Sequence, residues 1–206
     1  MRVVELRRAA LSTRRHALQW LALAAAPAVP TVLAADAADA AEVAKGLLRE
    51  GGGLVVAMCH ALAPGTFDPP GFRPGVCATQ RNLDDAGREQ ARRIGAWYRA
   101  NGLLPTAVRA SEWCRCLDTA RLAFGTVEPW PALNSVIGER ESEPAKTAVL
   151  RTALLRLAQT RASGFEVWVT HQANISALAG SATDSGEALL LRHDSASGRP
   201  RVLATF

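Results

Sequence analysis

The sequence lacks a long apolar segment and an internal repeat. Its N-terminal apolar stretch, residues 17–26, is followed by Pro27 and Pro30 and is too short for a membrane-spanning helix of about 20 residues. Hydrophobic residues make up 49% of the 206 residues and charged residues 21%, which are the proportions of a globular protein. This composition excludes a disordered, collagen-like or polytopic membrane chain. The length indicates one domain with a substantial core.

The main part of the chain also lacks a basic excess. The formal net charge is +5, but residues 1–34 hold five arginines against one acid, Glu5. Only about +1 therefore remains for residues 35–206, too little for the charged footprint of a nucleic-acid-binding domain. We expect no nucleic-acid partner.

The first 34 residues have the pattern of an export signal. An arginine-rich start and a short apolar stretch precede Val32-Leu33-Ala34, a small-residue cleavage site. Residues 12–18 (STRRHAL) resemble a twin-arginine signal, which implies export of the folded protein from a bacterial cytoplasm. A general secretory signal or an N-terminal anchor are the alternatives. We expect a periplasmic or secreted protein without a membrane span after signal removal, and a leader with a short helix over residues 35–50.

Only four cysteines are present: Cys59, Cys77, Cys114 and Cys116. In an oxidising compartment an even number favours disulfides, and four cysteines allow three pairings. We favour a bond from Cys77, in a loop rich in proline and glycine, to Cys114 or Cys116, which share one short segment. It would close a loop of about 40 residues and stabilise the fold by roughly 3–4 kcal/mol.

Strand and helix patterns alternate along the rest of the chain. Strands are predicted over residues 54–58, 106–110, 166–170, 187–191 and 201–205. Helices are predicted over residues 42–50, 84–100, 112–124, 145–161 and 174–179, with Asp84 capping the second. This alternation predicts a three-layer α/β domain with a mostly parallel sheet over residues 51–206.

Three side chains are expected at the carboxyl ends of these strands, where open α/β sheets bind ligands. His60 lies two residues beyond strand 54–58, His171 directly follows strand 166–170, and Arg115 falls in the first turn of a helix. Such an arginine, near free backbone N–H groups, favours a phosphate, and an imidazole can attack phosphorus. Taken alone, each histidine could be structural and Arg115 could form a salt bridge along its helix.

Four elements, in this order, resemble the histidine phosphatase superfamily, with its phosphoglycerate-mutase-like fold, and within it small exported single-domain members. They are His60, residues 83–91 (LDDAGREQA) for Leu-x-x-x-Gly-x-x-Gln-Ala, residues 111–120 (SEWCRCLDTA) for Ser-x-x-x-Arg-x-x-x-Thr-Ala, and Thr170-His171. The resemblance implies a phosphomonoesterase with a phosphohistidine at His60 and with Arg115 and His171 holding the phosphoryl group. It implies no cofactor or metal, and a phosphorylated small molecule or phosphoprotein as the partner. Arg81, which precedes the helix predicted over residues 84–100, would either add a second contact to the phosphate or pack its own loop.

One residue departs from the family pattern: the arginine before the first histidine is Cys59 here. By analogy with a lost oxyanion donor, its absence would cost about 3 kcal/mol, or roughly 100- to 1,000-fold in rate. The chain is therefore expected to be an impaired phosphatase or a non-catalytic pseudophosphatase that binds a phosphorylated ligand or partner.

Two minor alternatives involve the cysteines. One is a zinc site of Cys59, His60, Cys114 and His171, although the C-x-x-C spacing is missing. The other is a Cys59 nucleophile, whose pKa the charge of Arg115 would lower.

The general acid and the substrate are not identified by the sequence. Glu139, Glu141 and Glu143 are candidates for the acid, or form a solvated charge run. The loop over residues 63–77, with Phe67, Asp68, Phe72 and Arg73, is expected to line the mouth of the site.

Overall fold

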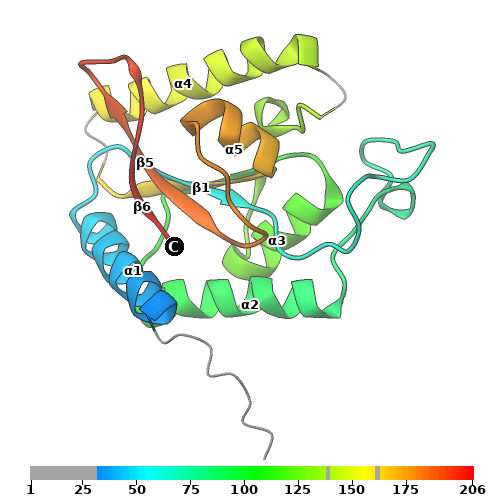
Figure 1. The fold of residues 1–206 in the computed structure, drawn as a ribbon, viewed down its shortest axis with the longest axis horizontal. Coiled ribbons are helices and arrows are strands. Elements are labelled where there is room, and N and C mark those ends of the chain that lie inside the picture. Colours follow the sequence, from blue (N-terminus) through cyan, green and yellow to red (C-terminus); the bar gives the residue numbers. More distant parts are fainter. Residues whose placement is uncertain (1–31, 138–139, 161–162) are drawn as a thin grey trace, which may run out of the picture. The chain divides into compact units, whose positions relative to one another are not determined.

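A six-stranded sheet organises the residues that the computed structural model describes, 32–137, 140–160 and 163–206 (Figure 1). The strands are β1 (Leu54–Cys59), β2 (Ala107–Ala110), β3 (Glu128–Pro129), β4 (Phe165–Thr170), β5 (Ala188–Asp194) and β6 (Arg199–Thr205). The helices are α1 (Val32–Glu50), α2 (Asp85–Ala100), α3 (Cys114–Phe124), α4 (Glu143–Thr160) and α5 (Gln172–Ala179). Single 3₁₀ turns occur at Cys77–Thr79, Pro131–Leu133 and Arg140–Ser142.

The strand order is β3-β2-β4-β1-β5-β6. β3, β2, β4 and β1 are parallel neighbours, and β5 and β6 add an antiparallel edge beside β1. The predicted α/β class and mostly parallel sheet are therefore confirmed. The helical connections place β1 and β4, far apart in sequence, side by side in the centre of the sheet.

Helices cover both faces of the sheet, as Figure 1 shows. All six residues of β1 are buried, and they alternate between two apolar clusters. Leu54, Val56 and Met58 pack in the cluster that includes residues of α1, α2 and α3. Val55, Ala57 and Cys59 pack in the cluster that includes residues of α4 and α5. This burial on both sides explains the continuous apolar run that predicted the strand.

The main error in the predicted elements concerns α1, which begins at Val32 rather than at residue 42. The alanine-rich segment has a high helix propensity, so the expected cleavage site and leader are helical. The rest of the predicted export signal, residues 1–31, lies outside the described residues. No helix in the described ranges is long and apolar enough to cross a membrane.

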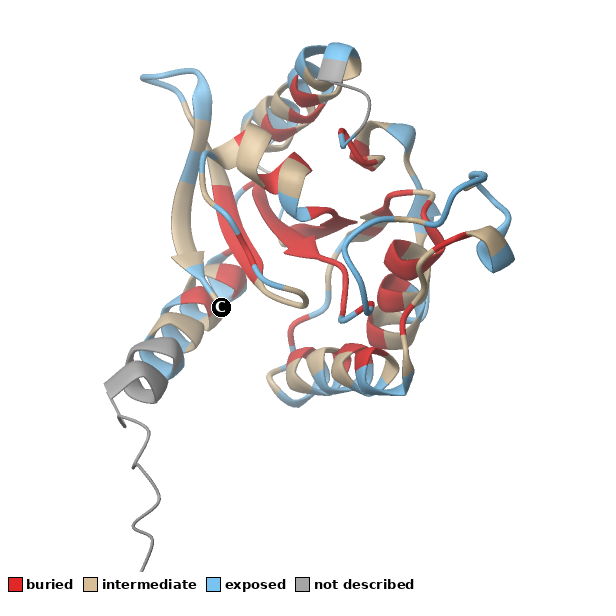
Figure 2. Ribbon diagram, turned by 45° about the vertical axis from the view of Figure 1, so that its right-hand side comes forward, coloured by how far each residue is buried: buried red, intermediate tan, exposed pale blue. Residues whose placement is uncertain are grey.

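The other predicted elements are present with boundary shifts of a few residues, and the short strand β3 was not predicted. The predicted cap of α2 is confirmed, because the Asp84 carboxylate accepts a hydrogen bond from the backbone N–H of Gly87 at 2.7 Å. Figure 2 shows that the central strands are buried, whereas the segment between β1 and α2 is mostly exposed.

α2 fixes the segment that leaves β1. A Cβ atom at Gly87 would lie 1.9 Å from the carbonyl oxygen of Leu62, so only glycine allows this close approach. Gln90 then accepts a hydrogen bond from the backbone N–H of Leu62 at 2.8 Å and donates one to the carbonyl of Ser185 at 2.7 Å. The glycine and glutamine of the predicted motif thus hold the two loops beside the end of β1.

Candidate active site

The two predicted histidines meet because their strands are neighbours. Cys59 at the end of β1 pairs with Thr170 at the end of β4, so His60 and His171 leave the sheet side by side. Both are buried, and their ring centroids lie 5.5 Å apart. β2 pairs with the other edge of β4, and Ser111 follows it. The strand ends therefore bring together the residues that the motifs singled out.

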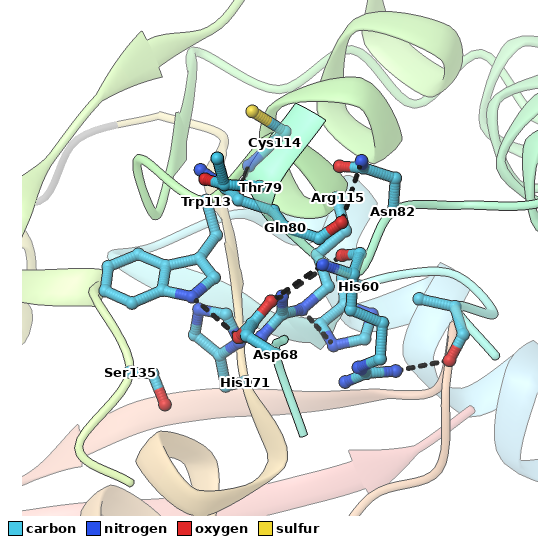
Figure 3. A network of polar contacts seen from close by, with 12 residues as sticks. His60, Asp68, Thr79, Gln80, Asn82, Trp113, Cys114, Arg115, Ser135 and His171 are labelled. Carbon is cyan, nitrogen blue, oxygen red and sulfur yellow. Dashed lines mark hydrogen bonds and ion pairs between the residues drawn. The ribbon is translucent and has the colours of Figure 1, made fainter. Parts of the chain in front are cut away.

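Arg115, in the first turn of α3, joins the two imidazoles (Figure 3). Its Nε donates a hydrogen bond to Nε2 of His60 at 3.1 Å, and its Nη2 lies 3.4 Å from Nδ1 of His171. The side chain is buried. The three residues predicted to hold a phosphoryl group thus lie in direct contact.

The hydrogen bonds of His60 define its tautomer. Its Nδ1 lies 2.8 Å from the carbonyl oxygen of Ala61, which can only accept, so Nδ1 carries the proton. Nε2 then holds the lone pair that faces Arg115. Burial, assisted by the charges of Arg115 and Arg81, lowers the pKa of His60 to about 4. At neutral pH this imidazole is therefore neutral, and its Nε2 lone pair, which accepts the Arg115 hydrogen bond, is of the type that can attack phosphorus once that bond is released.

His171 has the opposite tautomer. Its Nδ1 faces the Arg115 guanidinium, which only donates, so the proton lies on Nε2 and is donated to Oγ of Ser111 at 2.9 Å. The Ser111 hydroxyl donates in turn to Oδ1 of Asn134 at 3.2 Å. Burial, together with the nearby Arg115, holds the pKa of His171 well below its ordinary value. The serine of the second motif therefore orients this histidine.

The threonine of the same motif ties α3 to the loop after β1. Oγ1 of Thr119 accepts a hydrogen bond from the backbone N–H of Ala61 at 2.9 Å and donates one to the carbonyl of Arg115 at 2.7 Å. This bridge fixes Arg115 relative to the residue that follows His60.

Asp68 is a site residue whose role the sequence did not reveal. Its Oδ1 accepts hydrogen bonds from Nη1 of Arg115 at 2.8 Å and from the backbone N–H of Arg81 at 2.9 Å. Its Oδ2 accepts one from Nε1 of Trp113 at 3.3 Å (Figure 3). Partial burial alone would raise the pKa of Asp68, but these hydrogen bonds and the charge of Arg115 lower it overall. The salt bridge of Arg115 is therefore with this loop carboxylate, and not along its own helix as the alternative to a phosphate site had it.

Arg81 packs the loop, as one of its two expected roles requires, and it also lines the site. Its Nη1 donates to the carbonyl of Ala63, which holds the loop. Its Nε is buried and has no hydrogen-bond partner among the described residues. Arg81 lines the same cavity as His60, but this N–H group is buried, so a contact between Arg81 and a phosphate stays a prediction.

A cavity of about 680 Å³ opens over these groups. Of the loop residues expected at its mouth, Phe67, Asp68 and Phe72 line it and Arg73 does not. The candidate acids Glu141 and Glu143 do not line it either, and Glu139 lies outside the described residues. Within the described ranges, the carboxyl groups that line the cavity are those of Asp68 and Asp184.

Cys59 lines the cavity at the position where the motif that the sequence resembles has an arginine, but it is not an activated thiol. Burial raises its pKa to about 11 and outweighs the opposing effects of the Gln172 backbone and the Arg115 charge. Arg115 does act in the expected direction, but the expectation of a lowered pKa for Cys59 is wrong overall, and the thiol-nucleophile alternative loses its support.

The favoured disulfide is present between Cys77 and Cys114, with Cα atoms 5.6 Å apart, while Cys59 and Cys116 are free. This bond removes Cys114 from the zinc site that was considered as an alternative. Within the described ranges, no group of three or more His, Cys, Asp or Glu side chains could hold a metal ion.

No protein-family model and no curated protein matches this sequence. Solved structures do match in fold. The Entamoeba histolytica phosphoserine phosphatase with 3-phosphoglyceric acid matches at 12% identity with a TM-score of 0.53, over 74% of this chain and 95% of that chain. The mycobacterial glucosyl-3-phosphoglycerate phosphatase matches at 14% identity with a TM-score of 0.52, over 73% and 97%.

The α-ribazole phosphatase from Shigella flexneri matches at 16% identity with a TM-score of 0.50, over 73% of this chain and 95% of that chain. All three proteins belong to the histidine phosphatase superfamily. The part of the chain that the structure describes therefore has the fold of this superfamily, as the sequence motifs predicted.

Proposed function

We propose that the protein is a phosphomonoesterase that transfers the phosphoryl group of its substrate to His60. The observation that carries this proposal is the neutral, buried imidazole of His60, whose Nε2 lone pair faces the Arg115 guanidinium at 3.1 Å beside an open cavity. A lone pair beside a fixed cation is what attack on a bound phosphoryl group requires.

In the proposed reaction the phosphoryl oxygens take over N–H groups of Arg115, in the cavity that His171 and Arg81 also line. Nε2 of His60 then forms a bond to phosphorus, and the ester P–O bond breaks with its electron pair on the leaving oxygen. Water next attacks the phosphohistidine, which breaks the N–P bond, restores the imidazole and releases inorganic phosphate.

A second candidate, a non-catalytic binder of phosphorylated ligands, is favoured by one specific observation. Cys59 places a neutral buried thiol where the family has an arginine, so one phosphate-binding cation is missing from the cavity wall. Binding through Arg115 and His171 would persist without that group, whereas turnover would suffer because transition-state charge is less well stabilised.

We also propose that the protein works in the periplasm or outside the cell. The N-terminal signal pattern and the Cys77–Cys114 disulfide support this, because disulfides persist in oxidising compartments. Fusing residues 1–40 to a reporter tests the proposal: the reporter should be exported, and a reporter that stays in the cytoplasm contradicts it.

The test of the enzymatic proposal is phosphate release from an aryl phosphate by wild type and His60→Ala. His193→Ala is the matched control, because His193 lies on β5 and does not line the cavity. Activity should vanish in His60→Ala and persist in His193→Ala. Equal activity in wild type and His60→Ala would exclude His60 as the phosphoryl acceptor.

Thermal unfolding with vanadate distinguishes the two candidates when turnover is absent. A ligand that binds only the native state raises the melting temperature. Stabilisation of the wild type that disappears in Arg115→Ala, without any phosphate release, would identify a pseudophosphatase. Stabilisation that survives Arg115→Ala would place the anion site elsewhere.

A further inference from the structure

Exposed apolar side chains gather at the mouth of the active-site cavity. Of the seven large hydrophobic residues that are exposed in the described part of the chain, three line this one cavity. They are Leu62, Phe67 and Ile137, with 43%, 74% and 59% of their surface exposed. Single exposed apolar residues are ordinary, but a cluster of them beside a polar site marks a binding surface for an apolar group.

An aromatic face connects the reacting groups with this rim. The ring of His171 lies edge-on to Trp113 at 5.5 Å, and Trp113 stacks on Phe72 at 4.9 Å with an angle of 24° between the planes. All three line the cavity. Trp113 is itself nearly buried, so it backs the half-buried ring of Phe72, which together with the exposed Phe67 offers apolar surface to another aromatic group.

The loop that carries Phe67 is held in place. Its neighbour Asp68 is hydrogen-bonded by Arg115, by the backbone of Arg81 and by Trp113, and Cys77 is bonded to α3 through Cys114. A rim that is ordered before the ligand arrives loses less conformational entropy on binding.

The carboxyl groups in the cavity favour the same type of substrate. An alkoxide leaving group needs a proton donor, but Asp68 is paired with Arg115 and its lowered pKa keeps it ionised at neutral pH. The other described carboxyl group of the lining, on Asp184, is solvent-exposed. A phenol, with an ordinary pKa of about 10, departs as its anion without such help.

We infer that the preferred substrates are aryl phosphates, with the phosphoryl group on Arg115 and the aromatic ring against Phe67, Phe72 and Trp113. The ester P–O bond breaks as the bond from His60 to phosphorus forms, and the phenolate takes its proton from water. The inference rests on the proposed function for turnover, whereas the aromatic subsite can be tested by binding alone.

The kinetic test compares 1-naphthyl phosphate with glycerol 3-phosphate in wild type, Phe67→Ser and Ile137→Ser. Leu104→Ser is the matched control, because Leu104 is 76% exposed and does not line the cavity. Each rim substitution should lower kcat/KM for the naphthyl ester at least about fivefold. This is the size of effect expected when part of the apolar contact between one side chain and the naphthyl ring is lost. Values for glycerol 3-phosphate, and for both esters in Leu104→Ser, should not change.

The binding test uses calorimetry with the non-hydrolysable 1-naphthylphosphonate and methylphosphonate. The naphthyl compound should bind wild type at least about tenfold more tightly, and Phe67→Ser should reduce that ratio. Equal affinities, or the same loss in Leu104→Ser, would overturn the aromatic subsite. Turnover of both esters without an aromatic preference would overturn it while leaving the phosphatase proposal intact. A naphthyl preference in binding without any turnover would support the subsite and contradict the phosphatase.

Discussion

Nε of Arg115 lies 3.1 Å from Nε2 of His60 and donates a hydrogen bond to it. The guanidinium therefore covers the lone pair that would attack phosphorus, while its Nη1 is paired with Asp68 at 2.8 Å. Before His60 can attack a bound phosphoryl group, Arg115 must release Nε2, and an anion that approaches Nη1 competes with Asp68. Replacing one hydrogen bond by another gains less free energy than forming a new one. The contacts that Arg115 makes within the site therefore limit the affinity of the site for an anion.

Asp68→Asn should tighten phosphate and vanadate binding by about fivefold, because it removes the negative charge that competes for Arg115. The asparagine oxygen can still accept the backbone N–H of Arg81, which keeps this anchor of the loop, while the hydrogen bond from Trp113 is lost. Calorimetry with inorganic phosphate measures the effect, with Asp184→Asn as the control on the other carboxylate of the cavity lining. Weaker binding in Asp68→Asn would mean that the carboxylate mainly positions Arg115.

Cys59→Arg should raise kcat/KM by at least about tenfold, equivalent to about 1.4 kcal/mol of transition-state stabilisation. Cys59 lines the cavity, and a guanidinium there adds a bidentate donor for the phosphoryl oxygens. Steady-state kinetics on an aryl phosphate measures the change, and Cys59→Ser, which adds no cation, should not show it. An unchanged or lower rate in folded Cys59→Arg would favour the pseudophosphatase.

Stability should fall as the pH drops from about 7 to about 5. Burial lowers the pKa of His60 to about 4, whereas in the unfolded chain it titrates near 6.5. Between these values the unfolded state binds more protons, so acid lowers the free energy of unfolding, by about 2 kcal/mol for His60 across this range. Urea unfolding at both pH values measures this, and His60→Asn should lose about 2 kcal/mol less than wild type. An identical pH dependence in the variant would show that His60 is not held neutral.

Loss of the Cys77–Cys114 disulfide should destabilise the protein by about 3–4 kcal/mol, since the bond closes a loop with a sequence separation of 37. Urea unfolding of the Cys77→Ala, Cys114→Ala double variant measures the change. Thiol titration of denatured wild type should find Cys59 and Cys116 free. Four free thiols, or equal stability with and without the bond, would contradict this pairing.

The convergence of His60 and His171 was predictable because parallel strands end at the same edge of a sheet. Their strands are direct neighbours in register, so no loop conformation enters the prediction. The contact of Asp68 with Arg115 could not be predicted, for the opposite reason. It lies in an irregular loop without periodicity, and only the folded path of the chain brings its carboxylate to Arg115.

The disulfide partner of Cys77 and the pKa of Cys59 also could not be predicted from the spacing of residues in the sequence. Cys114 and Cys116 are two positions apart on one helix and point in roughly opposite directions, so the fold alone decides that Cys114 faces Cys77. The pKa of Cys59 depends on the balance between burial and the charge of Arg115, and burial outweighs that charge. The start of α1 was misplaced because an alanine-rich segment suits both a leader and a helix.

The central claim, that Nε2 of His60 accepts the phosphoryl group, is tested most directly by trapping the intermediate. Wild type mixed with an aryl phosphate, quenched rapidly and examined by intact-protein and peptide mass spectrometry, should carry one acid-labile phosphoryl group on His60. His60→Asn should carry none under the same conditions, while His193→Asn should be labelled like wild type. Phosphate release without any labelled histidine, or a label on a residue other than His60, would contradict the account.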